Sequence, residues 1–312
     1  MKAVASNTSG ASRMTALAGI GVENGTLEFE QVKAAGEMCS LGSAPSDYLF
    51  GYALKDTIEN VASSNKATYA IRLGNAADPS EEGTLEYVGT ADGYCSTRTI
   101  GVAGNGRFKN SGKSGSTNRT LAWTGFKSIV PPEDAALVPE SSTLAFDGST
   151  GAGYATNITE DTGAAPLRIA KEGTATWTLG GDLAFTGGID VREGTLNVGT
   201  MTTEIPYLRC DSGAELNFTG EAPTATGLYV DASAGMGAVS NVAFGASGAV
   251  TIVNWPENTK EVTLNATFTD CANRSNVSRW NVVIDGASSS KIVSLKSESV
   301  TVGEPGLTII FR

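Results

Sequence analysis

The hydrophobic and polar positions of this chain alternate in short runs that begin at glycine. The clearest runs read Glu-Asn-Gly-Thr-Leu-Glu-Phe at 23–29, Glu-Glu-Gly-Thr-Leu-Glu-Tyr at 81–87 and Arg-Glu-Gly-Thr-Leu-Asn-Val at 192–198. In an extended strand, Leu and the following aromatic residue or Val fall on one face, and the residue between them falls on the other. The runs therefore predict strands with one buried face and one solvated face, each entered through a glycine turn. Weaker copies occupy 142–146, 173–177, 213–218, 248–253 and 306–311.

The spacing of these turns distinguishes between β architectures. Gly173, Gly194 and Gly213 are 21 and 19 residues apart, whereas a β-sandwich of hairpins places a turn every 8–12 residues or so. An interval near 20 residues suits one coil of short strands that stacks on the previous coil. We therefore predict an all-β fold, a right-handed single-stranded β-helix (β-solenoid) with loop excursions. Equivalent interior positions are expected for Leu27, Leu85, Leu196 and Leu216.

The chain is expected to form one continuous solenoid domain in three stretches. Residues 1–130 would form the N-terminal coils, with a loop or short-helix excursion near 46–64, where the apolar spacing is partly helical. Residues 131–205 follow the break at Pro131-Pro132 and would form the second block of coils. Residues 206–312 would supply the C-terminal coils and a terminal strand. Within these stretches, the Gly-, Asn-, Ser- and Lys-rich segment 104–118 predicts an exposed loop, and 254–279 predicts another excursion.

Composition narrows the classes of function. The chain has 312 residues, of which 38 are Gly, and it carries a net charge of −11. Nucleic acid is a poor partner for such a surface, because phosphate contacts need clustered Lys and Arg. The chain contains no histidine, which excludes His-dependent catalytic triads and His metal ligands.

Cysteine usage and hydropathy bear on the cellular location. Four widely separated cysteines, at 39, 95, 210 and 271, exclude a dense disulfide framework. Buried free thiols are favoured for Cys39, Cys95, Cys210 and Cys271, with one or two disulfides between stacked segments left open. No apolar run is long enough for a transmembrane helix. No export signal is recognisable in the interrupted apolar stretch 14–22 either, so we expect the chain to be part of a larger polypeptide.

Residues 164–200 closely resemble the autotransporter-associated β-strand repeat, also called the passenger-associated transport repeat. Ala175 replaces the second glycine of that pattern, and Phe185 replaces its usual Tyr. Segments 40–42, 83–87 and 96–100 are similar to the longer proteins that carry the repeat. The resemblance implies an exported β-helical protein of the bacterial surface, with the repeat lying in the 131–205 block. The matching positions are Lys171, Gly173, Trp177, Leu179, Gly180, Phe185, Gly187, Gly188, Val191, Gly194, Thr195 and Leu196.

Three patterns suggest chemistry, and each has a simpler interpretation. Segment 106–114 approaches a phosphate-binding loop, but five residues separate its glycines where that loop has four, which favours a flexible loop. Gly180-Gly181-Asp182 lacks the third glycine of a calcium nonapeptide, which favours a turn. A glycoside hydrolase needs two carboxylates across one cleft, and the candidate acids are scattered along the chain. We therefore predict no catalytic, cofactor or metal site; the scattered acids are Asp147, Asp161, Asp182 and Asp190.

Tryptophans are the remaining candidates for ligand contacts. Trp177 lies on the strand of the repeat and is expected in the core, whereas Trp255 and Trp280 lie in less regular segments and could form an exposed ligand platform. The sequence thus favours a non-catalytic, exported or cell-surface passenger-like module with a structural or adhesive role. The alternative is a carbohydrate-binding β-helix, with a carbohydrate-active enzyme behind it. Expected partners are extracellular glycans or neighbouring surface proteins. Aromatics lined along one face would favour sugar binding, and two carboxylates converging in a groove would favour an enzyme.

Overall fold

In a computed structural model of the chain, every regular element of the described residues is a β-strand, which confirms the all-β prediction. No helix long and apolar enough to cross a membrane occurs in the described part of the chain. The described residues are 3–5, 20–32, 41, 71–96, 98–130, 138–149, 151–256, 261–264, 280–284, 292–295 and 299–303.

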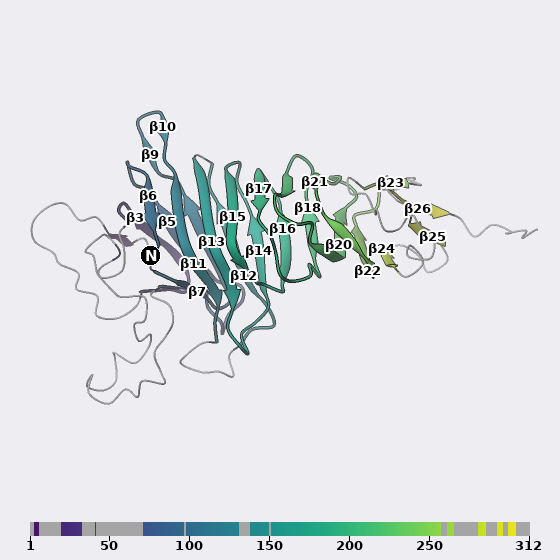
Figure 1. The fold of residues 1–312 in the computed structure, drawn as a ribbon, viewed down its shortest axis with the longest axis horizontal. Coiled ribbons are helices and arrows are strands. Elements are labelled where there is room, and N and C mark those ends of the chain that lie inside the picture. The colour runs from purple at the N-terminus through teal and green to yellow at the C-terminus, as the bar shows by residue number, and fades with distance from the viewer. Residues whose placement is uncertain are drawn as a thin grey trace, which may run out of the picture.

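Two large parallel sheets dominate the fold, and their strands follow one another along the long axis of the molecule (Figure 1). The first, sheet A, has eleven strands. In spatial order they are β1 (Ala3–Ala5), β3 (Gly25–Phe29), β5 (Glu82–Tyr87), β8 (Asn105–Asn110), β12 (Ser142–Asp147), β14 (Leu167–Lys171), β16 (Gly188–Val191), β18 (Leu208–Cys210), β20 (Thr224–Asp231), β22 (Ala243–Val253) and β24 (Trp280–Ile284).

The second sheet, sheet B, has ten strands, of which β6 (Gly93–Cys95) pairs with β11 beside β7. The others, in spatial order, are β2 (Ile20–Val22), β4 (Ile71–Leu73), β7 (Ile100–Val102), β11 (Leu121–Ser128), β13 (Ala152–Glu160), β15 (Thr176–Leu183), β17 (Thr195–Val198), β19 (Glu215–Phe218) and β21 (Ala238–Ser240).

The chain alternates strictly between the two sheets from β11 to β22. Each strand therefore pairs in parallel with the strand two elements earlier, as in the register Thr176↔Thr195↔Glu215. The glycine turns that precede β15, β17 and β19 have φ of 67°, 71° and 83° at Gly173, Gly194 and Gly213, a conformation that favours glycine. The interval near 20 residues is thus the length of one passage through both sheets.

The inner faces of the two sheets pack against each other and form one hydrophobic core. Alternate residues point inward, as the intermediate and buried positions of β8 and β17 show. Aromatic rings join the sheets: Phe146 of sheet A lies 4.8 Å from Trp177 of sheet B, and Phe108 lies 5.4 Å from Trp123, between ring centroids. Trp177 is fully buried and lies in the core, as expected.

The predicted set of four equivalent leucines divides between the two sheets. Leu27 pairs with Leu85 in sheet A, whereas Leu196 pairs with Leu216 in sheet B. In both sheets successive residues of a strand point to opposite faces, so the same Gly-Thr-Leu pattern can occur in either one. The expectation of one common position was therefore wrong, and each pair is equivalent only within its own sheet.

The prediction of an exposed loop at 104–118 was wrong for the first half of this segment. Residues 105–110 form β8 in sheet A, with Phe108 fully buried. The second half is a small antiparallel hairpin of β9 (Lys113–Ser114) and β10 (Thr117–Asn118), which projects beside β6 in Figure 1. Charged residues at 107 and 109 disguised the alternation, because both point to the outer face of sheet A.

The C-terminal part of the described chain contains a different element. β23 (Glu261–Thr263), β26 (Ser299–Gly303) and β25 (Ile292–Leu295) form an antiparallel three-stranded sheet. The predicted excursion near 46–64, the break at Pro131-Pro132 and most of 254–279 lie outside the described residues.

The described cysteines are both buried. Cys210 is a free thiol in β18, and burial raises its pKa to about 12. Cys95 lies in β6, whereas Cys39 and Cys271 are outside the described residues.

Candidate functional site

Charged side chains gather on the outer face of sheet A, near the carboxyl ends of its central strands. Because the strands are parallel and in register, their ends lie along one edge of the sheet. Asp147 ends β12, while Glu172 and Arg192 directly follow β14 and β16. Arg107 points outward from the preceding strand, β8, and Arg209 points outward from β18.

Arg107 joins carboxylates from three other strands: Glu82 at the start of β5, Asp147 at the end of β12 and Glu172 directly after β14. Its Nε lies 2.7 Å from Oε1 of Glu82, and its Nη1 lies 2.8 Å from Oδ2 of Asp147 and 2.6 Å from Oε2 of Glu172. Burial alone would lower the pKa of Arg107, but hydrogen bonds and attraction from Glu82 and Glu172 raise it above its ordinary value. The guanidinium is therefore permanently charged and shared among carboxylates.

The ion pairs continue along sheet A through two further arginines. Arg192 lies 2.9 Å from Glu172 and 3.0 Å from Asp190, and Arg209 forms a two-point pair with Asp211 at 2.7 and 2.8 Å. The Asp190 side chain is only 3% exposed, and its Oδ1 lies 3.7 Å from Nε of Arg209. These contacts form a continuous ladder of ion pairs across neighbouring strands.

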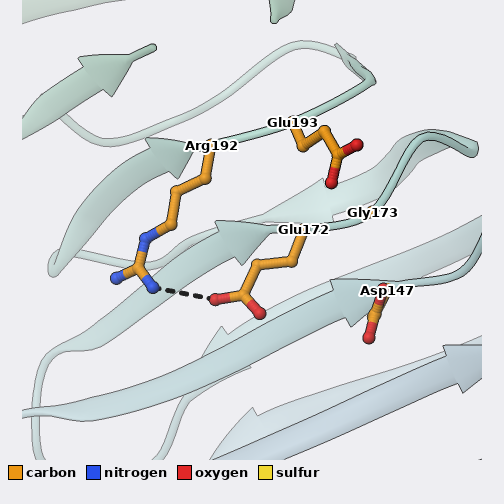
Figure 2. Close-up of a pocket in the computed structure, with 5 residues that line it drawn as sticks. All are labelled: Asp147, Glu172, Gly173, Arg192 and Glu193. Carbon is orange, nitrogen blue, oxygen red and sulfur yellow. Dashed lines mark hydrogen bonds and ion pairs between the residues drawn. The ribbon is translucent and has the colours of Figure 1, made fainter. Parts of the chain in front are cut away.

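A hollow of about 510 Å³ opens at this edge (Figure 2). Figure 2 shows that its lining comes from successive turns of sheet A, with the Arg192–Glu172 contact across it. The lining side chains are mostly acidic, so an anion is not favoured there. The residues that line it are Asp147, Glu172, Gly173, Arg192 and Glu193.

Lys171 lies fully buried next to this hollow. Its Nζ donates hydrogen bonds to the carbonyl oxygens of Glu172 at 2.8 Å and Glu193 at 3.0 Å, and also to that of Gly173. Burial lowers the pKa of Lys171 to about 8, opposed by the nearby carboxylates of Asp147, Glu193 and Glu172. The ammonium group thus ties two successive turns together, after β14 and after β16.

The charged side chains at this edge of sheet A form ion pairs and hydrogen bonds with neighbouring groups of the chain. A glycoside hydrolase needs one carboxylic acid and one carboxylate free to act on a bond between them. Here Arg107 lies between Asp147 and Glu172 and binds both. The amine of Lys171 is bound by three carbonyl groups. Within the described ranges, no cluster of three or more Asp, Glu or Cys is placed to hold a metal ion.

The four aspartates considered as candidate catalytic acids divide between the two sheets. Asp147 and Asp190 both belong to the charged edge of sheet A. Asp161 follows β13 and pairs with Lys127 of sheet B at 2.5 Å, and Asp182 is exposed on β15. The structure thus brings two of the four candidates to one edge and leaves the other two on sheet B.

The two candidate tryptophans lie at opposite ends of neighbouring strands. Trp255 follows β22 and packs, partly buried, against the core. Trp280 begins β24, where its backbone pairs with Gly248 near the middle of β22. A strand advances about 3.3 Å per residue, so the backbones at 248 and 255 are well separated and the structure does not bring the two positions together.

Tyrosines are the aromatic side chains that the sequence analysis missed. Tyr207 and Tyr229 stack on the outer face of sheet A with centroids 5.7 Å apart, and arginines lie over both rings. Tyr94 and Tyr154 are exposed on the outer face of sheet B, at 65% and 45%. Both exposed tyrosines stand between a glycine and a small inward residue, in Gly-Tyr-Cys and Gly-Tyr-Ala. That shared period-two pattern is the signal that would have placed them outward.

Comparison with protein-family models, with curated proteins and with solved structures finds no match to this chain. Its function is therefore inferred from its own geometry.

Proposed function

We propose that the chain is a non-catalytic right-handed single-stranded β-helix that serves as a structural or adhesive, passenger-like module of an exported or cell-surface bacterial protein. The single observation that carries the proposal is the regular return of the chain to each sheet. From β11 to β22 every passage adds one strand to sheet A and one to sheet B, each parallel to the last. Parallel strands joined in this way nearly always have a right-handed connection, which supports the proposed hand.

The residues that resemble the passenger-associated repeat have architectural roles, which supports a structural function. Lys171 ties successive turns together, and Trp177 fills the core while its Nε1 donates to the carbonyl oxygen of Asp147 at 3.1 Å. Phe185 and Leu196 are fully buried. Because these side chains lie in the core or hold turns together, they support a rod-like structural module. A ligand would therefore have to bind to the outer faces of the two sheets.

The charges on the outer surface favour extracellular glycans or neighbouring surface proteins as partners over nucleic acid. Arg107, Arg192 and Arg209 on sheet A are paired with carboxylates, and the chain is acidic overall, with a net charge of −11. Phosphate backbones require unpaired clustered cations. Tyr94 and Tyr154, exposed on one face of sheet B, favour carbohydrate binding as the second candidate function.

Surface display is tested by labelling intact cells that make the natural gene product with an antibody against the chain. We expect the antibody to label cells without permeabilisation, because a passenger-like module lies outside the envelope. An antibody against a cytosolic protein serves as the control and should label only permeabilised cells. Labelling of the chain only after permeabilisation would contradict the proposed location.

A further inference from the structure

One straight row of side chains crosses the outer face of sheet B. The register Tyr94↔Ala122↔Tyr154 places two tyrosines on β6 and β13, with an alanine on β11 between them. Both tyrosine side chains are exposed, at 65% and 45%. Since neighbouring strands lie about 4.8 Å apart, the two tyrosine backbones are separated by about 10 Å along the long axis.

The row continues with uncharged polar residues on the following strands. Thr178, Asn197, Asn217 and Ser240 stand in register on β15, β17, β19 and β21. The amide of Asn217 donates to Oδ1 of Asn197 at 3.2 Å, and the hydroxyl of Ser240 donates to Oδ1 of Asn217 at 2.8 Å. Such a row offers fixed donors and acceptors to the hydroxyl groups of a ligand, without selecting for charge.

The tyrosines on sheet A differ from this pair. Cζ of Arg168 lies 4.1 Å from the ring centroid of Tyr207, and that of Arg209 lies 5.1 Å from the centroid of Tyr229. Ring faces that already stack with guanidinium groups are less available to a ligand. Among the side chains that the structure describes, the exposed aromatic row is therefore a feature of sheet B.

We infer that this row binds a linear, neutral, β-1,4-linked polysaccharide that runs along the long axis of the molecule. Successive sugars in such a chain are turned over, so every second ring presents the same face. Each sugar advances the chain by about one strand spacing, so tyrosines two strands apart stack on alternate rings. Ala122 leaves space for the ring between them. The inference deepens the adhesive part of the proposed function and rests on it.

The test is titration calorimetry of the intact chain with cellohexaose and chitohexaose, with α-1,4-linked maltohexaose as the control ligand. We expect binding of a β-1,4-linked hexasaccharide and none of maltohexaose, whose helical chain does not present alternate rings to a flat row. Tyr94→Ala and Tyr154→Ala should each weaken binding about tenfold, and the double variant about a hundredfold. Ala122→Lys, which keeps both tyrosines but fills the gap between them, should abolish binding.

The matched control is Tyr229→Ala, which removes a tyrosine from the other sheet and should leave the affinity unchanged. Circular dichroism of each variant checks that the sheets are intact. The inference is overturned if the wild-type chain binds neither β-1,4-linked hexasaccharide, or if it binds them equally well without Tyr94 and Tyr154. Those results would leave surface display untouched, since the antibody experiment on intact cells tests it separately.

Discussion

At the scale of single residues, Lys171 holds two successive turns of the chain together. A buried ammonium group is costly unless its protons are bound. Here three carbonyl groups from two successive turns accept them. This contact explains why a lysine rather than an apolar residue stands at the inward register position between Phe146 and Val191.

We predict that Lys171→Met destabilises the chain by about 2 kcal/mol at pH 7, because the carbonyl groups lose their donors. The folded pKa of about 8 lies below the ordinary value of 10.5. The unfolded chain therefore binds more protons between these values, and the contribution of Lys171 to stability rises with pH from about 8 to 10.5. Urea unfolding at several pH values measures the difference between wild type and Lys171→Met.

The exposed Lys113 provides the control for that experiment. Lys113→Met should unfold with the stability and pH dependence of the wild type, because Lys113 lies on the exposed hairpin strand β9. If the stability of Lys171→Met depended on pH between 8 and 10.5 in the same way as that of the wild type, the pKa of Lys171 would not be lowered by burial.

At the scale of the strand, close stacking depends on glycines at the turns. Gly188, the first residue of β16, has φ of 95°, and a Cβ there would lie 2.2 Å from the carbonyl oxygen of Tyr207, the residue directly before β18. Gly213 has a similar φ of 83°, but a Cβ there would meet open space. The two positions therefore separate the cost of backbone conformation from the cost of lost stacking.

We predict that Gly213→Ala costs about 1 kcal/mol, as expected for a left-handed backbone alone. Gly188→Ala should cost at least about 3 kcal/mol, because β16 and β18 must also move apart. Urea denaturation of both variants measures the difference. Equal losses of stability would mean that β18 does not lie against β16 as described.

The strands also show how far the sequence could predict the structure. The Gly-Thr-Leu runs at β3, β5 and β17 were predicted because apolar and polar residues alternate after a glycine in each. At β17 a turn glycine and alternating burial coincide as expected, whereas Gly83 lies within β5 and not in a turn before it. β8 was missed because Arg107 and Lys109 point outward to Glu82 and Glu86, and these ion pairs require the neighbouring strand. Contacts between strands depend on register, which a single sequence reveals only through its repeats.

The candidate site was less predictable than the fold for the same reason. Nothing local to Arg107 indicates that it meets Glu82, Asp147 and Glu172, which are distant in the sequence. Tyr94 and Tyr154 become one surface feature only when β6 and β13 pair with β11. Trp255 and Trp280 were chosen for their irregular surroundings, and that criterion carried no information about where they lie.

At the scale of the whole molecule, the two sheets present different outer faces. Sheet A carries a ladder of ion pairs, whereas the central row of sheet B is uncharged and bears two exposed tyrosines. Such a pair of sheets can be stabilised on one face and bind a ligand on the other. Because each strand pairs with the strand of the preceding passage, stability is expected to depend on contacts between neighbouring strands.

The most direct test of the stacked-coil account is to measure distances between pairs of spin labels along sheet B by pulsed electron paramagnetic resonance. Spin labels are placed on a cysteine at Ala122 and on a second cysteine at Asn197, Asn217 or Ser240, with the four native cysteines replaced by alanine. These partners lie three, four and five strands from β11. The account predicts that the backbones of the labelled residues lie about 14, 19 and 24 Å apart, so the distance rises by one strand spacing from each pair to the next. Distances that do not increase in that order would contradict it.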